Sequence, residues 1–235
     1  MNGFFITGTD TGAGKTVITA IIALGLMDRS FNVTVRKPIE TGCRLEQGLL
    51  IPEDGGFYKD VLRLNDSIDD ITSVRFKEPL CPMAASEIEK KDIPLKKLIT
   101  ALTNVDKSTV LLVEGVGGVM APLKKNFLIA DLILELSLPV IVVAENRLGA
   151  INHTLLTIDF LKYRKINTAG IIINHTSDTD SLAHRTNPGV IAELSKTPII
   201  GTVPFINKKD TESLINISKK YINYDIILGF LQRKR

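Results

Sequence analysis

The sequence has few of the residues that hold structural metals or disulfides. It contains two cysteines and three histidines in 235 residues. Cys43 and Cys81 lie at no metal-binding spacing, and so sparse a pair indicates no disulfide framework. The three histidines do not cluster along the chain. These shortages argue against a zinc module or a small domain stapled by disulfides.

Long apolar runs and a strong charge of one sign are also missing. The apolar stretch at residues 17–27 is too short to span a bilayer, and the N-terminus lacks the basic and apolar segments of a secretory signal. The net charge is only +3. The basic clusters at 162–165 and 233–235 are typical of solvated faces. We therefore expect a cytoplasmic protein that binds neither membranes nor nucleic acid.

What the sequence does have is an alternation of short apolar runs with amphipathic stretches of helical length. The runs suit buried parallel strands, and they lie at 4–6, 110–113, 140–144, 170–173 and 199–203, with a more polar candidate at 32–36. The expected helices are 16–29, 95–104, 129–136, 150–163 and 189–195. The prediction is an α/β fold of P-loop NTPase type: a doubly wound, mainly parallel sheet with helices on both faces.

No repeat, low-complexity tract or linker divides the chain, so we expect one domain over residues 1–235. The segment at about 42–94 is the exception to the regular alternation, because it has several prolines and glycines and a convincing helix only at 57–64. Ligands of open α/β sheets bind beyond the carboxyl ends of the strands. This segment follows the second predicted strand, so it is well placed to line a site.

A glycine-rich loop follows the first predicted strand, Gly8-Thr9-Asp10-Thr11-Gly12-Ala13-Gly14-Lys15-Thr16. Between a strand and a helix, such a loop indicates phosphate binding, because glycines let several backbone N–H groups face one anion. In this context Lys15 reaches the outer phosphates of a nucleotide and the Thr16 hydroxyl coordinates Mg²⁺. Thr9 stands where the first glycine is usual, so the loop is a variant form. The predicted nucleotide-binding residues are Gly12, Ala13, Gly14, Lys15, Thr16 and Val17.

Two further strand ends carry charged residues. The run at 110–113 leads into Glu114-Gly115-Val116-Gly117-Gly118. P-loop proteins hold Mg²⁺ with a carboxylate at such a strand end, although an acid there is also found as a plain turn partner. The second segment is Arg36-Lys37-Pro38-Ile39-Glu40-Thr41-Gly42. It places Lys37 at the mouth of the sheet, but on this pattern alone a surface lysine is the better interpretation.

Two polar segments follow the later strands. Leu148-Gly149-Ala150-Ile151-Asn152-His153 reads as a loop that feeds a helix N-terminus, which can bind a carboxylate. We interpret His153 there as a packing or capping residue. Asn174 ends the run at 170–173, and its amide offers the donor and acceptor that a nucleobase edge requires. A turn-starting asparagine fits the same spacing equally well.

Taken in order, these segments resemble the dethiobiotin synthetase family, ATP-dependent ring-closing enzymes of biotin biosynthesis. The resemblance runs from near residue 4 to near residue 206. Its carriers are Gly8-Thr9-Asp10-Thr11, Gly14-Lys15-Thr16, Lys37-Pro38, Thr41-Gly42, Val113-Glu114-Gly115, Gly117-Gly118, Pro122-Leu123, Leu148-Gly149, Ile151-Asn152-His153, Asn174, Gly201 and Pro204. Phe76-x-Glu78-Pro79-x-x-Pro82 is similar to the proline-rich substrate loop of that family.

The resemblance implies a cyclo-ligase that forms carbon–nitrogen bonds. CO₂, drawn from bicarbonate, carboxylates one amine of 7,8-diaminononanoate, and ATP phosphorylates the carbamate. The second amine then closes the cyclic urea and gives dethiobiotin, ADP and phosphate. The resemblance also implies catalytic roles for Lys37, Lys15 and Thr11.

The same resemblance implies the remaining site residues. Mg²⁺ would be held by Thr16, Asp54 and Glu114, with Glu53 or Asp60 as alternatives to Asp54. The substrate would contact Thr41 and Gly117, while the other subunit of a homodimer binds its carboxylate through Leu148, Gly149, Ala150, Ile151 and Asn152. Asn174 and Pro204 would hold the nucleobase. Two positions depart from the family pattern, since Gly12 replaces an acid near the substrate amines and His175 replaces an aspartate.

The main alternative is a regulatory ATPase of the partitioning or cell-division type, which shares the variant loop and the parallel sheet. Those proteins carry a second, signature lysine in the loop, where this chain has Asp10 and Thr11. A cobalamin-type amidotransferase synthetase would need a further glutaminase domain, for which we expect no room. The sequence therefore favours the ring-closing enzyme.

Overall fold

The computed structural model describes residues 1–179 and 181–232. Its centre is a six-stranded sheet in which every pairing is parallel, in the order β12-β11-β10-β1-β7-β2. The strands are β1 (Gly3–Gly8), β2 (Val33–Arg36), β7 (Val110–Gly118), β10 (Val140–Glu145), β11 (Thr168–Asn174) and β12 (Ile199–Val203). All six predicted strands are present, and the more polar candidate is the edge strand β2. The predicted fold class is confirmed.

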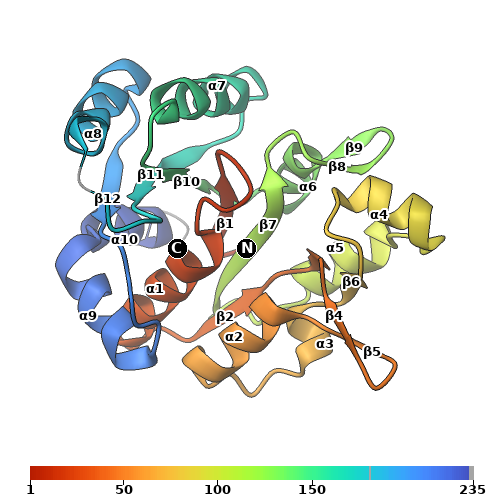
Figure 1. Cartoon of the computed structure of the whole chain (residues 1–235). Coiled ribbons are helices and arrows are strands. Elements are labelled where there is room, and N and C mark those ends of the chain that lie inside the picture. The colour runs from red at the N-terminus through yellow and green to blue at the C-terminus, as the bar shows by residue number, and fades with distance from the viewer. Residues whose placement is uncertain (180, 233–235) are drawn as a thin grey trace.

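Helices cover both faces of the sheet (Figure 1). Neighbouring residues of β1 face opposite ways, so that Phe4 packs into one apolar core and Phe5 into the other. The first core is covered by α1 (Lys15–Met27), α2 (Glu53–Leu62), α3 (Ile68–Ile71), α9 (Thr211–Tyr221) and α10 (Tyr224–Gln232). The second is covered by α4 (Pro82–Glu89), α5 (Leu95–Thr103), α6 (Ile129–Leu136), α7 (Ala150–Tyr163) and α8 (Leu182–Ser195).

The segment predicted to be irregular is more ordered than its composition suggests. Helix α2 begins at Glu53, four residues before the predicted start, and α3 and α4 were not expected. Short strands complete the segment: β3 (Ile39–Thr41) pairs with β6 (Val74–Phe76), and β4 (Arg44–Glu46) pairs with β5 (Leu49–Ile51). The β4–β5 hairpin projects from the body of the molecule (Figure 1). A further small hairpin, β8 (Pro122–Lys124) with β9 (Phe127–Leu128), follows β7.

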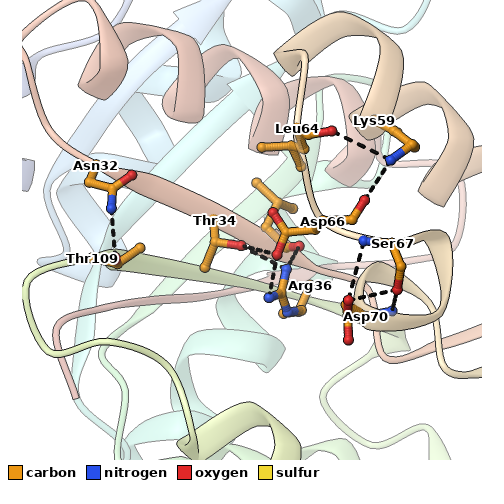
Figure 2. Close-up of polar contacts among 10 residues, drawn as sticks. Asn32, Thr34, Arg36, Lys59, Leu64, Asp66, Ser67, Asp70 and Thr109 are labelled. Atoms are coloured by element: carbon orange, nitrogen blue, oxygen red, sulfur yellow. Dashed lines mark hydrogen bonds and ion pairs between the residues drawn. The ribbon is translucent and has the colours of Figure 1, made fainter.

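Polar contacts fasten the chain after α2 to the edge strand β2, as Figure 2 shows. The Arg36 guanidinium donates to Asp66 at 2.6 Å and to the Thr34 hydroxyl at 2.7 Å. Lys59 of α2 donates to the Asp66 carbonyl oxygen at 2.6 Å. Because β2 ends at Arg36, these contacts fix the strand end that presents the next residue, Lys37.

Candidate active site

The phosphate loop connects β1 to α1 in the geometry that its sequence predicts. Thr9 N–H donates to the Val143 carbonyl oxygen of β10 at 3.0 Å, which ties the loop to the sheet. The loop ends at Gly14, whose φ of 86° lies in the left-handed region, immediately before α1. The Lys15 ammonium folds back over the loop and donates to the Asp10 carbonyl oxygen at 3.1 Å. A helix N-terminus and a lysine therefore face the same concavity.

Asn174 supports this loop from behind. Its side-chain amide donates to the Ala13 carbonyl oxygen at 2.9 Å. A Cβ atom on Gly14 would lie 2.1 Å from the Asn174 Nδ2 atom, so the close approach requires glycine at this position. Asn174 pairs in the sheet with Val203, which brings it beside Pro204. The two residues predicted to hold the nucleobase are therefore close together.

Lys37, directly after the end of β2, meets Glu114 in the middle of the neighbouring strand β7. Lys37 Nζ lies 3.0 Å from Glu114 Oε1 and also forms an ion pair with Asp54 of α2. The Thr16 hydroxyl donates to the same Glu114 oxygen at 3.1 Å. Glu114 is 1% exposed and Lys37 is 6% exposed. The predicted metal ligands, Thr16, Asp54 and Glu114, thus converge around one positive charge.

Burial and neighbouring charges set the protonation of the two lysines. Burial lowers the pKa of Lys37, but the carboxylates of Glu114 and Asp54 outweigh it, so the pKa is raised. The pKa of Lys15 is lowered. Burial is the main cause, the Glu114 carboxylate partly offsets it, and the nearby Lys37 ammonium lowers the pKa further. Lys37 is therefore held as a cation, which suits a group that binds anions.

Two residues without a predicted role complete the site, and both act through α2. The Glu40 carboxylate accepts hydrogen bonds from the backbone N–H groups of Asp54 at 3.0 Å and Gly55 at 3.2 Å. Tyr58, one turn after Asp54 on α2, is fully buried, and its hydroxyl donates a hydrogen bond to Glu114 Oε2. Burial and the Glu114 charge raise the pKa of Tyr58 well above its usual value. The i, i+4 spacing of Asp54 and Tyr58 would have indicated this arrangement had the helix start been known.

Two adjoining cavities open at this edge of the sheet. The smaller, of about 360 Å³, is lined by Thr11, Gly12, Gly14, Lys15, Thr16, Val17, Lys37, Glu40, Thr41, Asp54, Glu114, Val116 and Gly117. The larger, of about 560 Å³, shares Thr11, Thr41, Val116 and Gly117 with it and is otherwise mainly apolar. Pro79, Leu80, Cys81 and Pro82 line the larger cavity, together with Leu156 and Phe160 of α7. The phosphate-loop cavity thus adjoins a mainly apolar one.

The predicted carboxylate-binding segment lies apart from both cavities. None of Leu148, Gly149, Ala150, Ile151 and Asn152 lines either one. Ala150 is buried at the start of α7, whereas the Leu148 side chain is 86% exposed. Ala13, Asn174 and Pro204 also lie outside both cavity linings.

Comparison with known proteins decides the family. Residues 2–213 match the model of a family described as an AAA domain. The ATP-dependent dethiobiotin synthetase BioD of Thermodesulfovibrio yellowstonii is 40% identical over 95% of this chain and 96% of its own. BioD of Bacillus subtilis strain 168 is 36% identical over 97% of this chain and 98% of its own. BioD of Methanococcus vannielii is 41% identical over 88% of this chain and 94% of its own. This chain belongs to the dethiobiotin synthetase family.

Two solved structures share this fold. The septum site-determining protein MinD of Pyrococcus horikoshii OT3, complexed with Mg-ADP, aligns with a TM-score of 0.57 and 14% identity over 97% of this chain and 98% of its own. A ParA family ATPase from Chlorobium tepidum TLS aligns with a TM-score of 0.55 and 12% identity over 94% of this chain and all of its own. At these identities the likeness shows the fold alone. The regulatory ATPases are therefore relatives in architecture, while the sequence identity lies with the dethiobiotin synthetases.

The donor set of this synthetase fits a magnesium ion. Thr16, Asp54 and Glu114 supply only oxygen atoms, and Asp54 and Glu114 already share one cation, the Lys37 ammonium. Within the described part of the chain, no three or more His, Cys, Asp or Glu side chains form a metal-binding group. Mg²⁺ commonly binds through one or two carboxylates together with substrate phosphates and water, so a site with two carboxylates suits it.

Among the described residues, no helix has the length and apolar character needed to cross a membrane.

Proposed function

We propose that this chain closes a cyclic urea at the junction of its two cavities. The substrates are 7,8-diaminononanoate, CO₂ and ATP, and the products are dethiobiotin, ADP and phosphate. Sequence identity to the dethiobiotin synthetases over nearly the whole chain supports this reaction. The single structural observation that carries it is that the phosphate-loop cavity, which Lys15 and Lys37 line, adjoins a mainly apolar cavity. A triphosphate fits the first and the aliphatic chain of a diamine fits the second.

The chain's own residues bring two anions together. The carbamate formed from one amine and the γ-phosphate of ATP repel each other, so their approach requires concentrated positive charge. Lys15 binds the phosphates from the loop, and Lys37 faces both anions from the end of β2. Thr11 and Thr41, which line both cavities, donate hydrogen bonds to the carbamate. A Mg²⁺ ion held by Thr16, Asp54 and Glu114 would neutralise phosphate charge.

The covalent steps then balance without a further co-reactant. A carbamate oxygen attacks the γ-phosphorus of ATP and ADP leaves, which gives a carbamoyl phosphate. The second amine attacks the carbamoyl carbon and expels phosphate, which carries away the carbamate oxygen. The apolar walls of the larger cavity, among them Phe160 and Leu156, hold the aliphatic chain and limit access of water to the reactive carbamoyl group.

A homodimer would complete the substrate site. Exposed apolar side chains gather on and near α7, with Leu148 at 86%, Leu156 at 62% and Tyr163 at 82% exposure. Such exposure on neighbouring residues is typical of an interface. The segment 148–152 lines neither cavity of its own chain, although the next residue, His153, lines the larger one; the segment begins a helix, whose N–H groups suit a carboxylate. In this proposal the segment binds the substrate carboxylate of the partner subunit.

A turnover assay tests the proposed function. Purified protein is incubated with ATP, Mg²⁺, bicarbonate and 7,8-diaminononanoate, and ADP and dethiobiotin are quantified by mass spectrometry. The proposal predicts equal amounts of both products and no ADP without the diamine. ADP formation that ignores the diamine would contradict it and would favour a regulatory ATPase.

A further inference from the structure

Tyr58 has a place in the site that neither the motifs nor the proposed reaction explains. Its side chain is fully buried beneath the phosphate-loop cavity, and its hydroxyl donates to Glu114 Oε2. A buried tyrosine hydroxyl needs a hydrogen-bond partner, and a buried carboxylate is costly unless several donors satisfy it. The contact therefore satisfies both groups, and it also constrains Glu114.

The two oxygens of Glu114 have different partners. Oε1 accepts from the Thr16 hydroxyl at 3.1 Å and from Lys37 Nζ at 3.0 Å, so it faces the phosphate loop. Oε2 is held by Tyr58 on the opposite side. With both oxygens bound, the carboxylate cannot turn about its last side-chain bond without losing hydrogen bonds. Tyr58 thereby holds the Glu114 carboxylate in the orientation that presents one oxygen to the cavity.

Helix α2 couples this contact to Asp54. Asp54 and Tyr58 lie one helical turn apart on α2, so they occupy the same face. The first turn of the helix is fixed by Glu40, which accepts from the backbone N–H groups of Asp54 and Gly55. One short helix therefore supplies an oxygen donor to the cation position and the group that orients another donor, Glu114.

We propose that Tyr58 is a positioning residue for the divalent cation, acting through Glu114 and not touching the ion or the substrates. This inference rests on the proposed function, because it takes Glu114 as a ligand of that cation. Residues that hold metal ligands in place commonly affect metal affinity by about 10- to 100-fold when they are removed. Replacement of the hydroxyl leaves Oε2 buried without its donor, and the carboxylate is then no longer held in this orientation.

The test measures cation binding directly, with Mn²⁺ as the probe. The protein–ADP complex is titrated with Mn²⁺, and free ion is followed by electron paramagnetic resonance, for the unmodified chain, Tyr58→Phe, Glu114→Gln and Tyr224→Phe. Tyr224 of α10 is the matched control, because it is buried and its hydroxyl lies 2.7 Å from Ser218 Oγ. Thermal unfolding of each variant is recorded beside the titration.

The expected result is a Mn²⁺ dissociation constant about 10-fold higher in Tyr58→Phe, unchanged in Tyr224→Phe, and raised in Glu114→Gln. In the double variant, Tyr58→Phe should add nothing to Glu114→Gln. Unmodified affinity in Tyr58→Phe, or equal losses in both tyrosine variants, would overturn the role of Tyr58. If the unmodified chain binds no Mn²⁺, or Glu114→Gln binds it normally, the metal site of the proposed function fails instead.

A second measurement needs no change at Tyr58. The chain has four tyrosines, and labelling with 3-fluorotyrosine gives one ¹⁹F resonance for each. Phenylalanine variants of Tyr163, Tyr221 and Tyr224 assign three signals and leave that of Tyr58. Addition of Mg²⁺ to the ADP complex should shift the Tyr58 resonance more than that of Tyr224. A Tyr58 signal that ignores Mg²⁺ would overturn the proposal.

Discussion

Lys37 Nζ lies 3.0 Å from Glu114 Oε1, although 77 residues separate the two in the chain. Parallel strands make this contact, because β2 and β7 are neighbours and both end at the same edge of the sheet. Thr16 and Asp54 reach the same point from α1 and α2. The catalytic charge proposed for this enzyme therefore depends on the register of two strands and on one contact from each helix.

Replacement of Lys37 by methionine should abolish most turnover while ADP still binds. The variant loses a cation that faces the developing charge of phosphoryl transfer, and loss of one such group typically lowers kcat by about 10²- to 10³-fold. Steady-state kinetics and calorimetric titration with ADP measure the two effects. Lys124→Met is the control, because Lys124 pairs with Asp92 on the surface at 2.6 Å. Normal turnover in Lys37→Met would remove this lysine from the mechanism.

Gly14→Ala should lose nucleotide binding and stability together. The alanine would be strained at a φ of 86°, and its Cβ would lie 2.1 Å from Asn174 Nδ2. A residue held in this region costs about 1–3 kcal/mol in the free energy of unfolding. Urea unfolding measures the loss, and the control Gly189→Ala lies in α8 with nothing within 4 Å of its new methyl group. Gly14→Ala that is as stable as Gly189→Ala would contradict the assigned packing.

Asn174→Ala should weaken discrimination among nucleoside triphosphates. The amide both supports the Ala13 carbonyl oxygen at 2.9 Å and, in our proposal, reads the base. We expect the ratio of kcat/KM for ATP to that for CTP to approach one. The control Asn32→Ala removes an amide that donates to Thr109 at 2.9 Å, outside the site. An unchanged ratio in Asn174→Ala would exclude base reading by this residue.

Mixed dimers test whether two subunits share a substrate site. Lys37→Ala and Asn152→Ala should each be inactive alone, because they disable opposite parts of one composite site. A heterodimer of the two contains one intact site and should recover up to about half of the unmodified activity, as expected for a closed two-fold dimer. Tagged subunits purified as verified heterodimers allow the assay. No recovery would place the whole site within one subunit.

Asp131 should contribute to stability in a pH-dependent way. Burial raises the pKa of Asp131, but hydrogen bonds from Leu128 N–H at 2.7 Å and Arg164 at 2.6 Å outweigh this, so the pKa lies below its ordinary value. The stabilisation is therefore present above the unfolded pKa of about 3.9 and is lost as the pH falls through the folded value. Asp131→Asn should unfold about 1 kcal/mol more easily at neutral pH.

Chemical unfolding of Asp131→Asn and the unmodified chain at neutral and acidic pH measures this effect. The difference in unfolding free energy should shrink as the pH approaches the folded pKa from above. Asp159→Asn is the control, because its contact with Lys162 is 4.0 Å long on an exposed helix face. A difference for Asp131→Asn that stays constant with pH would contradict the assignment.

The sheet was predictable because its strands are buried on both faces. Residues such as Val142 and Ile172 belong to apolar runs that only a doubly covered strand explains. Helix α2 was placed four residues too late, because its first turn holds Asp54 and two glycines, which have low helix propensity. The Glu40 carboxylate stabilises that turn from outside the helix, and no local pattern reveals such a contact.

The phosphate loop and Glu114 were found from the sequence because each follows a recognisable apolar run, whereas Lys37 was assigned a role only through the family resemblance. Tyr58 was missed, since its partner lies 56 residues away and its apolar neighbours make it look like part of the core. Helix α9 was not predicted either. Its mean hydropathy is low and it contributes only Leu214 and Ser218 as buried residues, so it lacks the apolar content of the helices that were predicted.

The transfer of one oxygen atom from bicarbonate to phosphate tests most directly whether ring closure proceeds through a carbamoyl phosphate. Bicarbonate labelled with ¹⁸O is supplied in ordinary water with ATP and the diamine, and the reaction is quenched before the label exchanges with water. If a carbamate oxygen attacks ATP and leaves with phosphate, the released phosphate carries one ¹⁸O atom. Phosphate without ¹⁸O, in which water supplied the one oxygen that did not come from ATP, would show hydrolysis of ATP and would contradict ring closure through a carbamoyl phosphate.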